Sequence, residues 1–449
     1  MTEHDSVSVF GPDTSFTGGA ERAVLVGVER PGAHWPAETS LAELERLADT
    51  AGAQTVAVTT QKLDAPNPRT FVGTGKAEEI ASLARDLGAD VVIFDDELTP
   101  SQQANLEKIV GRDVKVIDRT ALILDIFALH ATSREGRLQV RLAQNQYLYP
   151  RLRGMWAHLA SNRMGGGVGS RFGEGESQLE VDRRMVRKRI TSIKRELKKL
   201  SSVRSLQRES RYGSGMFKVA LAGYTNAGKS SLLNRLTDAD VLSYDKLFAT
   251  LDSTTRRFEL PEGRHITLTD TVGFIQKLPT TLVEAFKSTL DEITGADLIL
   301  HVVDASSDEH ERQMQAVEEV LDQIKAHEIP CITVFNKADL LTEEARAALA
   351  ARHPHDVVVS AQTGWGIDAL VKRIELAASS ADAAMDVLVP YAKGKLVSLA
   401  HERCRITSEE HTAEGTLLSL FVPSDCVSQF EPYRVERGGA QGGAVAAQR

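Results

Sequence analysis

The residues with the most definite chemistry form the segment GYTNAGKSS, from Gly223 to Ser231. An apolar run, Phe217 to Ala222, precedes this segment, and the helix-like sequence LLNRL follows it. Two glycines separated by four residues and followed by Lys229 and Ser230 predict a strand, a phosphate loop and a helix. Backbone N–H groups of such a loop surround a polyphosphate, while the lysine reaches the outer phosphates and the serine binds Mg²⁺. The segment therefore predicts nucleotide chemistry.

A polar, threonine-rich connection follows, YDKLFATLDSTTRR from Tyr244 to Arg257, as expected for a nucleotide-sensing loop. Thr250 is the candidate for a second Mg²⁺ ligand, because its hydroxyl could reach the metal when the γ-phosphate holds the loop closed. Thr254 and Thr255 are rivals for this role. The next apolar alternation ends in DTVG, Asp270 to Gly273, which places a carboxylate near the metal and a glycine N–H near the γ-phosphate.

Two later strand ends predict which base is bound. NKAD, Asn336 to Asp339, follows an apolar run, and Asp339 can accept the N1–H and 2-amino hydrogens of guanine. Adenine offers no such pair of donors, and a buried unpaired carboxylate costs on the order of several kcal/mol. Lys337 would lie against the base plane. The loop Ser360 to Gln362 follows another apolar run, and the Ala361 N–H suits the guanine O6.

These four ordered elements, each after a strand-like run, predict a P-loop GTPase domain with a doubly wound sheet that binds GTP or GDP. We expect Lys229, Thr250 and Gly273 to act in catalysis, and Ser230 and Thr250 to bind the metal. The predicted nucleotide contacts are Gly223, Tyr224, Thr225, Asn226, Ala227, Gly228, Lys229, Ser230, Ser231, Phe248, Ala249, Thr250, Leu251, Asp252, Asp270, Thr271, Val272, Gly273, Asn336, Lys337, Ala338, Asp339, Ser360, Ala361 and Gln362.

The residue after Gly273 is Phe274, where many GTPases carry a glutamine that orients the attacking water. A phenyl ring cannot hydrogen-bond that water, so we expect slow intrinsic hydrolysis that depends on a partner. Simple packing of Phe274 beside the loop is compatible with this. Asn226 could help to hold K⁺ beside the phosphates, or it could only brace the loop.

The elements upstream of the phosphate loop predict an antiparallel helical hairpin. Leu138, Leu142, Asn145, Tyr149, Leu152 and Trp156 form one apolar seam, and Val186, Ile190, Ile193, Leu197 and Leu200 form another. Asn145 could set the register of the hairpin. The tip between these helices, Arg163 to Ser177, contains six glycines and is too bare to pack a core.

The second helix also carries a run of positive charge. From Arg183 to Arg204 there are ten Lys or Arg residues and one acid, Glu196. A solvated helix face is the plain alternative, but a run of one sign that leads from a glycine-rich tip favours contact with RNA phosphates. The RNA-contact candidates are Arg163, Gly166, Arg171, Arg183, Arg187 and Lys194.

The chain before the hairpin alternates apolar runs with helical stretches, which predicts a small α/β domain with a parallel sheet. Within it, TFVGTGKAEE lacks the first glycine of a phosphate loop, at Thr70, and has no Ser or Thr after Lys76. We interpret it as a structural turn before a helix. The acids from Asp95 to Glu97 are expected to cap the next helix, where they suit the helix dipole.

The C-terminal part predicts an Ala/Ser linker, SSADAAM, followed by a small α+β domain with strands paired around Glu414 and Gly415. The expected organisation is disorder in 1–21, an α/β domain in 22–136, the hairpin in 137–212, the GTPase domain in 213–378, the α+β domain in 385–433 and a disordered tail in 434–449.

Composition limits the partners and the compartment. Lys and Arg total 53 against 62 Asp and Glu, a net charge of −9 over 449 residues, so a nucleic-acid partner needs a local basic surface. Three scattered cysteines give neither a disulfide framework nor a four-ligand zinc site, which fits a reducing cytosol. No signal peptide or membrane span is recognisable. We expect a cytoplasmic monomer.

The motifs GYTNAGKSS, LFATLDSTTRR, DTVGFIQKLP with LVEAFKSTL, and NKADL together closely resemble the HflX family of translation-associated GTPases. The segments Asp118 to Gln144 and Gly175 to Arg184, and EHTAEGTLLSLFV near the C-terminus, resemble that family outside the GTPase domain, so the resemblance covers about residues 22 to 430. It implies binding to the large ribosomal subunit, ribosome-stimulated GTP hydrolysis and splitting of stalled ribosomes, with the hairpin tip near the peptidyl transferase centre. Glu174 departs from the family's usual proline, which leaves the tip's conformation open.

Two other function classes remain open at this point. The chain could be a regulatory GTP-binding module that recruits a protein or membrane partner, although the basic hairpin and the missing membrane signals disfavour this. It could also be a P-loop metabolic kinase, which NKAD and SAQ disfavour.

Overall fold

The computed structural model describes residues 20–111, 113–152, 178–212, 216–237, 247–248, 251–277, 279, 282, 287–380, 382–423 and 426–435. Several predictions from the sequence lie outside these residues. They concern the disorder expected at the two ends, the glycine-rich tip with Arg163, Gly166, Arg171 and Glu174, and the loop residues Ala249 and Thr250.

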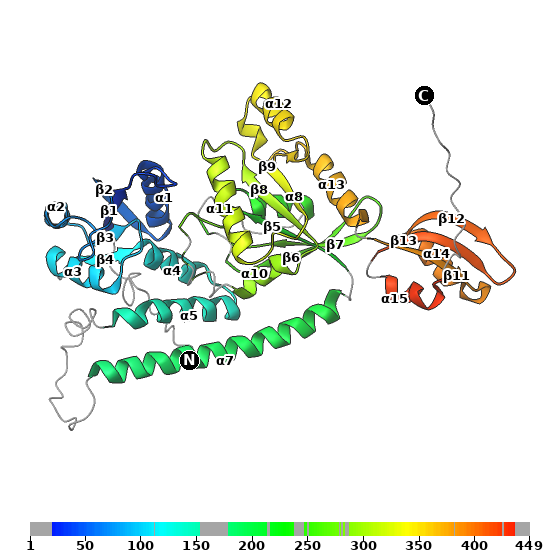
Figure 1. The fold of residues 1–449 in the computed structure, drawn as a ribbon, viewed down its shortest axis with the longest axis horizontal. Coiled ribbons are helices and arrows are strands. Elements are labelled where there is room, and N and C mark those ends of the chain that lie inside the picture. The colour runs from blue at the N-terminus through cyan, green and yellow to red at the C-terminus, as the bar shows by residue number, and fades with distance from the viewer. Residues whose placement is uncertain are drawn as a thin grey trace.

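The N-terminal unit contains a four-stranded sheet in the order β2-β1-β3-β4, and every pair is parallel (Figure 1). Its elements are β1 (Glu21–Glu29), α1 (Ala37–Thr50), β2 (Ala53–Lys62), α2 (Thr74–Asp86), β3 (Val91–Phe94), α3 (Pro100–Val110) and β4 (Lys115–Asp118). Alternate strand residues pack on opposite faces, with Val24, Val92 and Val116 against α2 and α3. The predicted parallel α/β arrangement is confirmed.

Two local predictions in this unit have different outcomes. TFVGTGK does form a turn before a helix, with Phe71 in the left-handed region (φ 65°) and Gly73 preceding α2. The capping role of Asp95 to Glu97 is wrong. Thr99 caps α3 instead, in a reciprocal capping box with Gln102, and Pro100 begins the helix. Asp95 and Asp96 are thereby free to pair with cations described below.

Helices α5 (Arg134–Arg151) and α7 (Gln178–Tyr212) form an antiparallel pair, which Figure 1 shows below the N-terminal unit. Leu138 and Leu142 of α5 pack with Ile193 of α7, as the two apolar seams predict. Asn145 has no cross-helix role among the described contacts, because its amide donates to the Arg141 carbonyl of its own helix at 2.6 Å. A short helix, α4 (Arg119–His130), connects β4 to α5.

The GTPase unit contains a six-stranded sheet in the order β10-β9-β8-β5-β7-β6, with only β6 antiparallel to its neighbour. Its elements are β5 (Phe217–Gly223), α8 (Lys229–Thr237), β6 (Thr254–Glu259), β7 (His265–Asp270), α10 (Lys287–Thr294), β8 (Leu298–Asp304), α11 (His310–Gln323), β9 (Cys331–Asn336), α12 (Glu343–Arg352), β10 (Val357–Val358) and α13 (Ile367–Ser380). Helices lie on both faces of this sheet (Figure 1), so the doubly wound architecture is confirmed.

The C-terminal unit is α+β, as predicted, with the sheet order β11-β13-β12. It comprises β11 (Ala383–Val389), α14 (Gly394–Arg403), β12 (Arg405–His411), β13 (Thr416–Val422) and the short α15 (Val427–Phe430). The expected linker SSADAAM is wrong in its extent. Helix α13 continues to Ser380 and β11 begins at Ala383, while Arg264 of the GTPase unit pairs with Asp382 at 2.7 Å.

One hydrophobic core continues from the N-terminal unit into the GTPase unit. It contains Leu25 and Leu44 of the first unit together with Phe248, Phe274 and Ile299 of the second. The two units therefore pack as a single body at this face, and the nucleotide-sensing segments are part of that packing. Among the residues that the structure describes, no helix is both long enough and apolar enough to cross a membrane.

Candidate nucleotide site

The phosphate loop lies between β5 and α8, where the sequence placed it. Two glycines are required by close approach: a Cβ on Gly223 would come within 2.2 Å of the Val302 carbonyl oxygen, and one on Gly228 within 2.2 Å of the Asn336 amide nitrogen. Asn226 and Gly228 both adopt positive φ, at 61° and 91°. The loop is thus a bare backbone cradle of the kind that admits a polyphosphate.

Lys229 is buried at the mouth of this cradle. Its ammonium group donates to the carbonyl oxygens of Gly223 and Tyr224 at 3.1 and 2.9 Å. Burial lowers its pKa to about 8, and the nearby Asp270 carboxylate opposes that change. A bound phosphate would offer this cation a full negative charge in place of two carbonyl dipoles.

The residues predicted to bind Mg²⁺ fit that ion as far as they are described. The Ser230 hydroxyl donates to Asp270 at 2.6 Å, so a hydroxyl and a buried carboxylate lie side by side at the end of β7. Hard oxygen ligands of this kind suit Mg²⁺, which would neutralise charge on the phosphates. Thr255 is a weaker candidate than the sequence suggested, because it lies in β6 and its hydroxyl bonds that of Thr269 at 3.0 Å. The role of Thr250 stays a prediction.

Gly273 has room for no side chain. A Cβ there would lie 2.9 Å from the Thr225 Cα and 3.1 Å from the Lys229 ammonium nitrogen, which places its backbone at the phosphate loop. Phe274, the next residue, is buried in the shared core, and its backbone pairs with Gly223 and Thr225 at 3.0 and 2.7 Å. Its ring is therefore a packing element beside the site.

The base-recognition loops meet the phosphate loop at the ends of β9 and β10. Asn336 donates to the Ala227 carbonyl at 2.9 Å and accepts from the Ala361 N–H at 3.0 Å. The Ser360 hydroxyl donates to Asp339 at 2.5 Å, and Lys337 pairs with Asp304 at 2.7 Å. The structure thus brings NKAD, SAQ and the phosphate loop together. It also gives the Ala361 N–H, predicted to meet guanine O6, an intramolecular acceptor.

Sequence reasoning missed the part of the N-terminal unit that contacts the phosphate side. Tyr224, in the phosphate loop, donates its hydroxyl to Glu43 of α1 and accepts from the Gln276 N–H at 2.8 Å. Trp35 stacks on the Tyr224 ring, with centroids 6.5 Å apart. Burial and the adjacent Glu43 raise the pKa of Tyr224 well above its ordinary value, so the hydroxyl remains a donor.

A buried cluster of charges extends from this tyrosine. Arg119, at the start of α4, pairs with Glu43 and with Asp95, the latter at 2.6 Å. Lys277, two residues after Ile275, also pairs with Asp95, and with Asp96 at 3.0 Å. Burial alone would raise the pKa of Asp95, but Arg119 and Lys277 together lower it. Asp95 and Asp96, two of the three acids that the sequence suggested as helix caps, thus hold Lys277 in the segment after DTVG.

The nucleotide-sensing loop is anchored to the same unit. Phe248 packs edge-on against Phe127 of α4, with centroids 4.6 Å apart, and Asp252 accepts hydrogen bonds from Thr132 and Ser133 just before α5. The apolar residues of LFATLD were a usable signal, since a loop that only contacts a nucleotide has no need of three large apolar side chains.

The described RNA-contact candidates lie on α7. Lys194 is exposed, Arg187 is exposed and donates to the Tyr149 hydroxyl, and Arg183 is partly buried. The exposed cations of the helix between 184 and 199 are Arg184, Arg187, Lys188, Arg189, Lys194, Arg195, Lys198 and Lys199. Their contact with RNA stays a prediction.

Family models match most of the chain. They are "GTP-binding GTPase N-terminal" over residues 38–128, "GTP-binding GTPase Middle Region" over 130–211, "50S ribosome-binding GTPase" over 218–337 and "C-terminal region of MMR_HSR1 domain" over 305–375. Together with the nucleotide geometry, they describe a GTP-hydrolysing enzyme.

Individual relatives of known name support the same assignment as a GTPase. The GTPase HflX of Caldanaerobacter subterraneus is 46% identical over 88% of this chain and 89% of its own length, and that of Escherichia coli is 44% identical over 84% and 88%. A GTP-binding protein from Sulfolobus solfataricus in complex with GDP is structurally similar at a TM-score of 0.41, with 22% identity over 80% of this chain and 99% of its own. At that distance the structure carries no residue roles to this chain. The extent and identity of the HflX matches show that the chain belongs to the HflX family of GTPases.

Proposed function

We propose that this enzyme acts on the large ribosomal subunit, and that GTP binding and ribosome-stimulated hydrolysis are used to split or rescue stalled ribosomes. Two findings support the proposal: the family model named for 50S-binding GTPases and the relatives named HflX. The observation that carries it in this molecule is the exposed basic face of α7, in a chain that is acidic overall. A local cationic helix in an acidic protein is the electrostatic signature of a nucleic-acid contact.

In this proposal, Lys229 and Gly273 contact the γ-phosphate, and Ser230 and Thr250 hold Mg²⁺. The buried Phe274 cannot orient water, so hydrolysis requires a group or surface that the ribosome supplies.

We further propose that the protein works as a cytoplasmic monomer. Asn226, exposed in the phosphate loop at φ 61°, would help to hold K⁺, and a GTPase rate that is equal in K⁺ and Na⁺ would exclude this role.

The first test is GTP turnover with and without purified large subunits. We expect stimulation of at least about tenfold, equivalent to ~1.4 kcal/mol of barrier. Absence of stimulation, with nucleotide binding intact, would contradict the proposal that the enzyme acts on the ribosome. It would favour the alternative of a GTP-binding module that recruits a protein partner.

The second test is charge reversal on α7, measured by co-sedimentation with large subunits. Arg187 is not suitable for this test, because its guanidinium donates to the Tyr149 hydroxyl and its loss could disturb the helix pair. Lys188 and Lys194 are exposed and are suitable. The Lys188→Glu/Lys194→Glu variant should lose most of its binding at physiological salt. Lys372→Glu/Lys395→Glu, which makes the same charge change at exposed sites elsewhere, should bind normally.

A further inference from the structure

Helix α5 begins where the N-terminal unit meets the nucleotide-sensing loop. Ser133 is its N-cap, and the Ser133 hydroxyl accepts the Gly136 N–H at 2.8 Å. Asp252 of the loop accepts the N–H groups of Thr132 and Ser133 at 3.0 and 2.7 Å, the Thr132 hydroxyl at 2.8 Å, and the Ser133 hydroxyl. A carboxylate from the nucleotide-sensing loop thus completes the cap of the hairpin's first helix.

The other flank of the loop is also held by the N-terminal unit. Phe248 has a positive φ of 59°, which a phenylalanine adopts only where its surroundings require it. Its ring is buried against Phe127, and Leu251 is buried in the same core. Phe248 and Asp252 lie four positions apart in sequence and bracket Thr250. Phe248 and Asp252, which flank the candidate metal ligand in sequence, are therefore held by α4 and by the start of α5.

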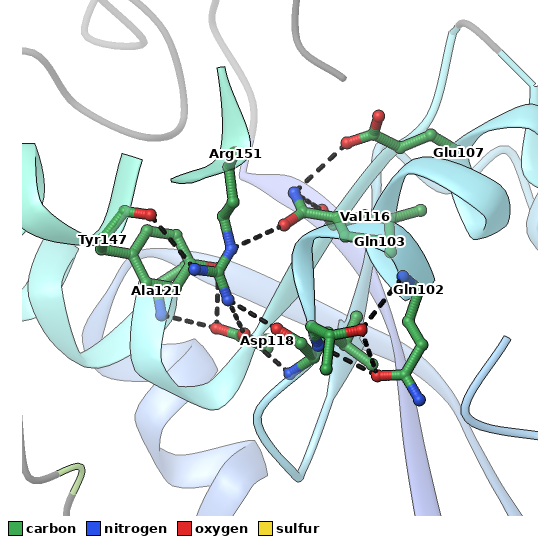
Figure 2. Close-up of polar contacts among 10 residues, drawn as sticks. Gln102, Gln103, Glu107, Val116, Asp118, Ala121, Tyr147 and Arg151 are labelled. Carbon is green, nitrogen blue, oxygen red and sulfur yellow. Dashed lines mark hydrogen bonds and ion pairs between the residues drawn. The ribbon is translucent and has the colours of Figure 1, made fainter. Parts of the chain in front are cut away.

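The far end of α5 is attached just as firmly, as Figure 2 shows. Arg151 donates to Asp118 at 3.3 Å, to the Leu98 carbonyl at 2.6 Å and to Gln103 at 3.1 Å, and Tyr147 donates to Asp118 at 2.9 Å. Between its two ends, Val140 and Ala143 of α5 are buried in the shared core. Helix α5, the first helix of the hairpin, is therefore joined to the sensing loop at its start and held by the N-terminal unit along its length.

We propose that Thr132 and Ser133 are positioning residues of the GTPase reaction, which fix the sensing loop to α5 through Asp252 and so couple the nucleotide state to the hairpin. The link between this coupling and the ribosome rests on the proposed function. The coupling is reciprocal. A nucleotide that displaces Asp252 alters the cap of α5, and a partner that holds the hairpin fixes the loop.

Gly136→Ala is the sharpest probe of this contact. An added Cβ would lie 2.3 Å from the Asp252 Oδ1 and 3.1 Å from the Ser133 hydroxyl oxygen, so the carboxylate must shift away from the cap. Alanine favours a helix more than glycine does, so any weakening of the first turn of α5 in this variant comes from the displaced cap and not from helix propensity. Gly75→Ala, in the first turn of α2, is the matched control, because no heavy atom lies within 4 Å of its added Cβ.

The readout is amide hydrogen exchange in the first turn of α5, measured on the full chain with GDP and with a non-hydrolysable GTP analogue. In the natural protein, exchange should differ about fivefold between the two nucleotides, equivalent to ~1 kcal/mol for one N-cap. Gly136→Ala and Ser133→Ala should abolish the difference, while Ser133→Thr and Gly75→Ala should keep it. The single-turnover rate constant for GTP hydrolysis by Gly136→Ala should fall about fivefold. Its steady-state KM for GTP should stay within twofold of the natural value.

Equal exchange with both nucleotides in the natural protein would overturn the proposal, and so would a Gly136→Ala variant that keeps the difference. In an Asp252→Ala background, Gly136→Ala should have no further effect on exchange, since its target is gone; an additive effect would show that it acts elsewhere. These measurements need no ribosome. A failure of ribosome binding alone would therefore contradict the proposed function and leave the coupling standing.

Discussion

The two sides of the nucleotide site are built in different ways. The base side is internal to the GTPase unit, where Asn336 joins the phosphate loop to Ala361 and Ser360 holds Asp339. The phosphate side is shared between two units, because Tyr224 and Lys277 pair with Glu43 and Asp95 of the N-terminal unit. The segments predicted to read the base thus belong to one unit, whereas those predicted to sense the γ-phosphate are packed against another.

This difference separates specificity from regulation. Changes on the base side should alter which nucleotide binds and leave the domain packing intact. Changes on the phosphate side should alter stability and turnover together, because the same contacts serve both. The variants below test that separation, from the largest expected effect to the smallest.

Arg119→Ala should give the largest effect. Arg119 is 1% exposed and pairs with Glu43 and Asp95, so its removal leaves the buried Glu43 without its paired cation and Asp95 with Lys277 alone. We expect the free energy of unfolding to fall by about 3–5 kcal/mol, measured by urea denaturation. Arg352→Ala removes an exposed ion pair with Glu311, at 3.7 Å, and should cost under about 0.5 kcal/mol.

The pH dependence of the Arg119→Ala loss identifies its cause. Burial already raises the pKa of Glu43 above its ordinary value, and loss of the Arg119 guanidinium raises it further. The folded state then binds more protons than the unfolded state, so the stability of the variant recovers as pH falls from 8 towards 5. In the natural protein the pKa of Asp95 is lowered, and its contribution is retained down to the acid range. A loss that does not vary with pH would point to packing and not to charge.

Asp339→Asn tests the base side. The amide cannot accept both guanine donors, so GTP affinity should fall by roughly 100-fold, equivalent to ~3 kcal/mol. Xanthosine triphosphate, which presents an acceptor at that position, should bind the variant better than GTP does. Nucleotide competition measures both. Urea stability and the exchange of the first turn of α5 should stay at the natural values; a large loss of stability would contradict the separation of the two sides.

Motifs that depend on neighbours in sequence could be predicted, and contacts that depend on domain packing could not. The phosphate loop, DTVG, NKAD and SAQ each follow a strand, so chain order placed them at one sheet edge. Asp95 and Arg119 follow the neighbouring strands β3 and β4 of one unit, whereas Lys277 comes from the GTPase unit, so only the packing of the two units brings Lys277 to Asp95. The charge of Asp95 to Glu97 predicts a helix cap that the structure does not contain, whereas Thr99 and Gln102 carry the local signal of the cap that forms.

Two buried tyrosines offer the finest test, since each donates its hydroxyl to a buried carboxylate. Tyr224 bonds Glu43 and holds the Gln276 N–H at the phosphate side, whereas Tyr147 of α5 bonds Asp118 at the end of β4 (Figure 2). Tyr224→Phe and Tyr147→Phe should each cost about 1–2 kcal/mol in urea denaturation, since each loses a bond to a charged acceptor.

Only Tyr224→Phe should also lower the kcat of GTP hydrolysis, by about fivefold, because the Gln276 N–H loses its acceptor and the segment after Gly273 is less well held. Single-turnover hydrolysis at a temperature where both variants are folded makes the comparison. If both variants lowered kcat equally, the tyrosine in the phosphate loop would serve stability alone. The N-terminal unit would then act as a structural support for the phosphate side, without positioning the segment that follows DTVG.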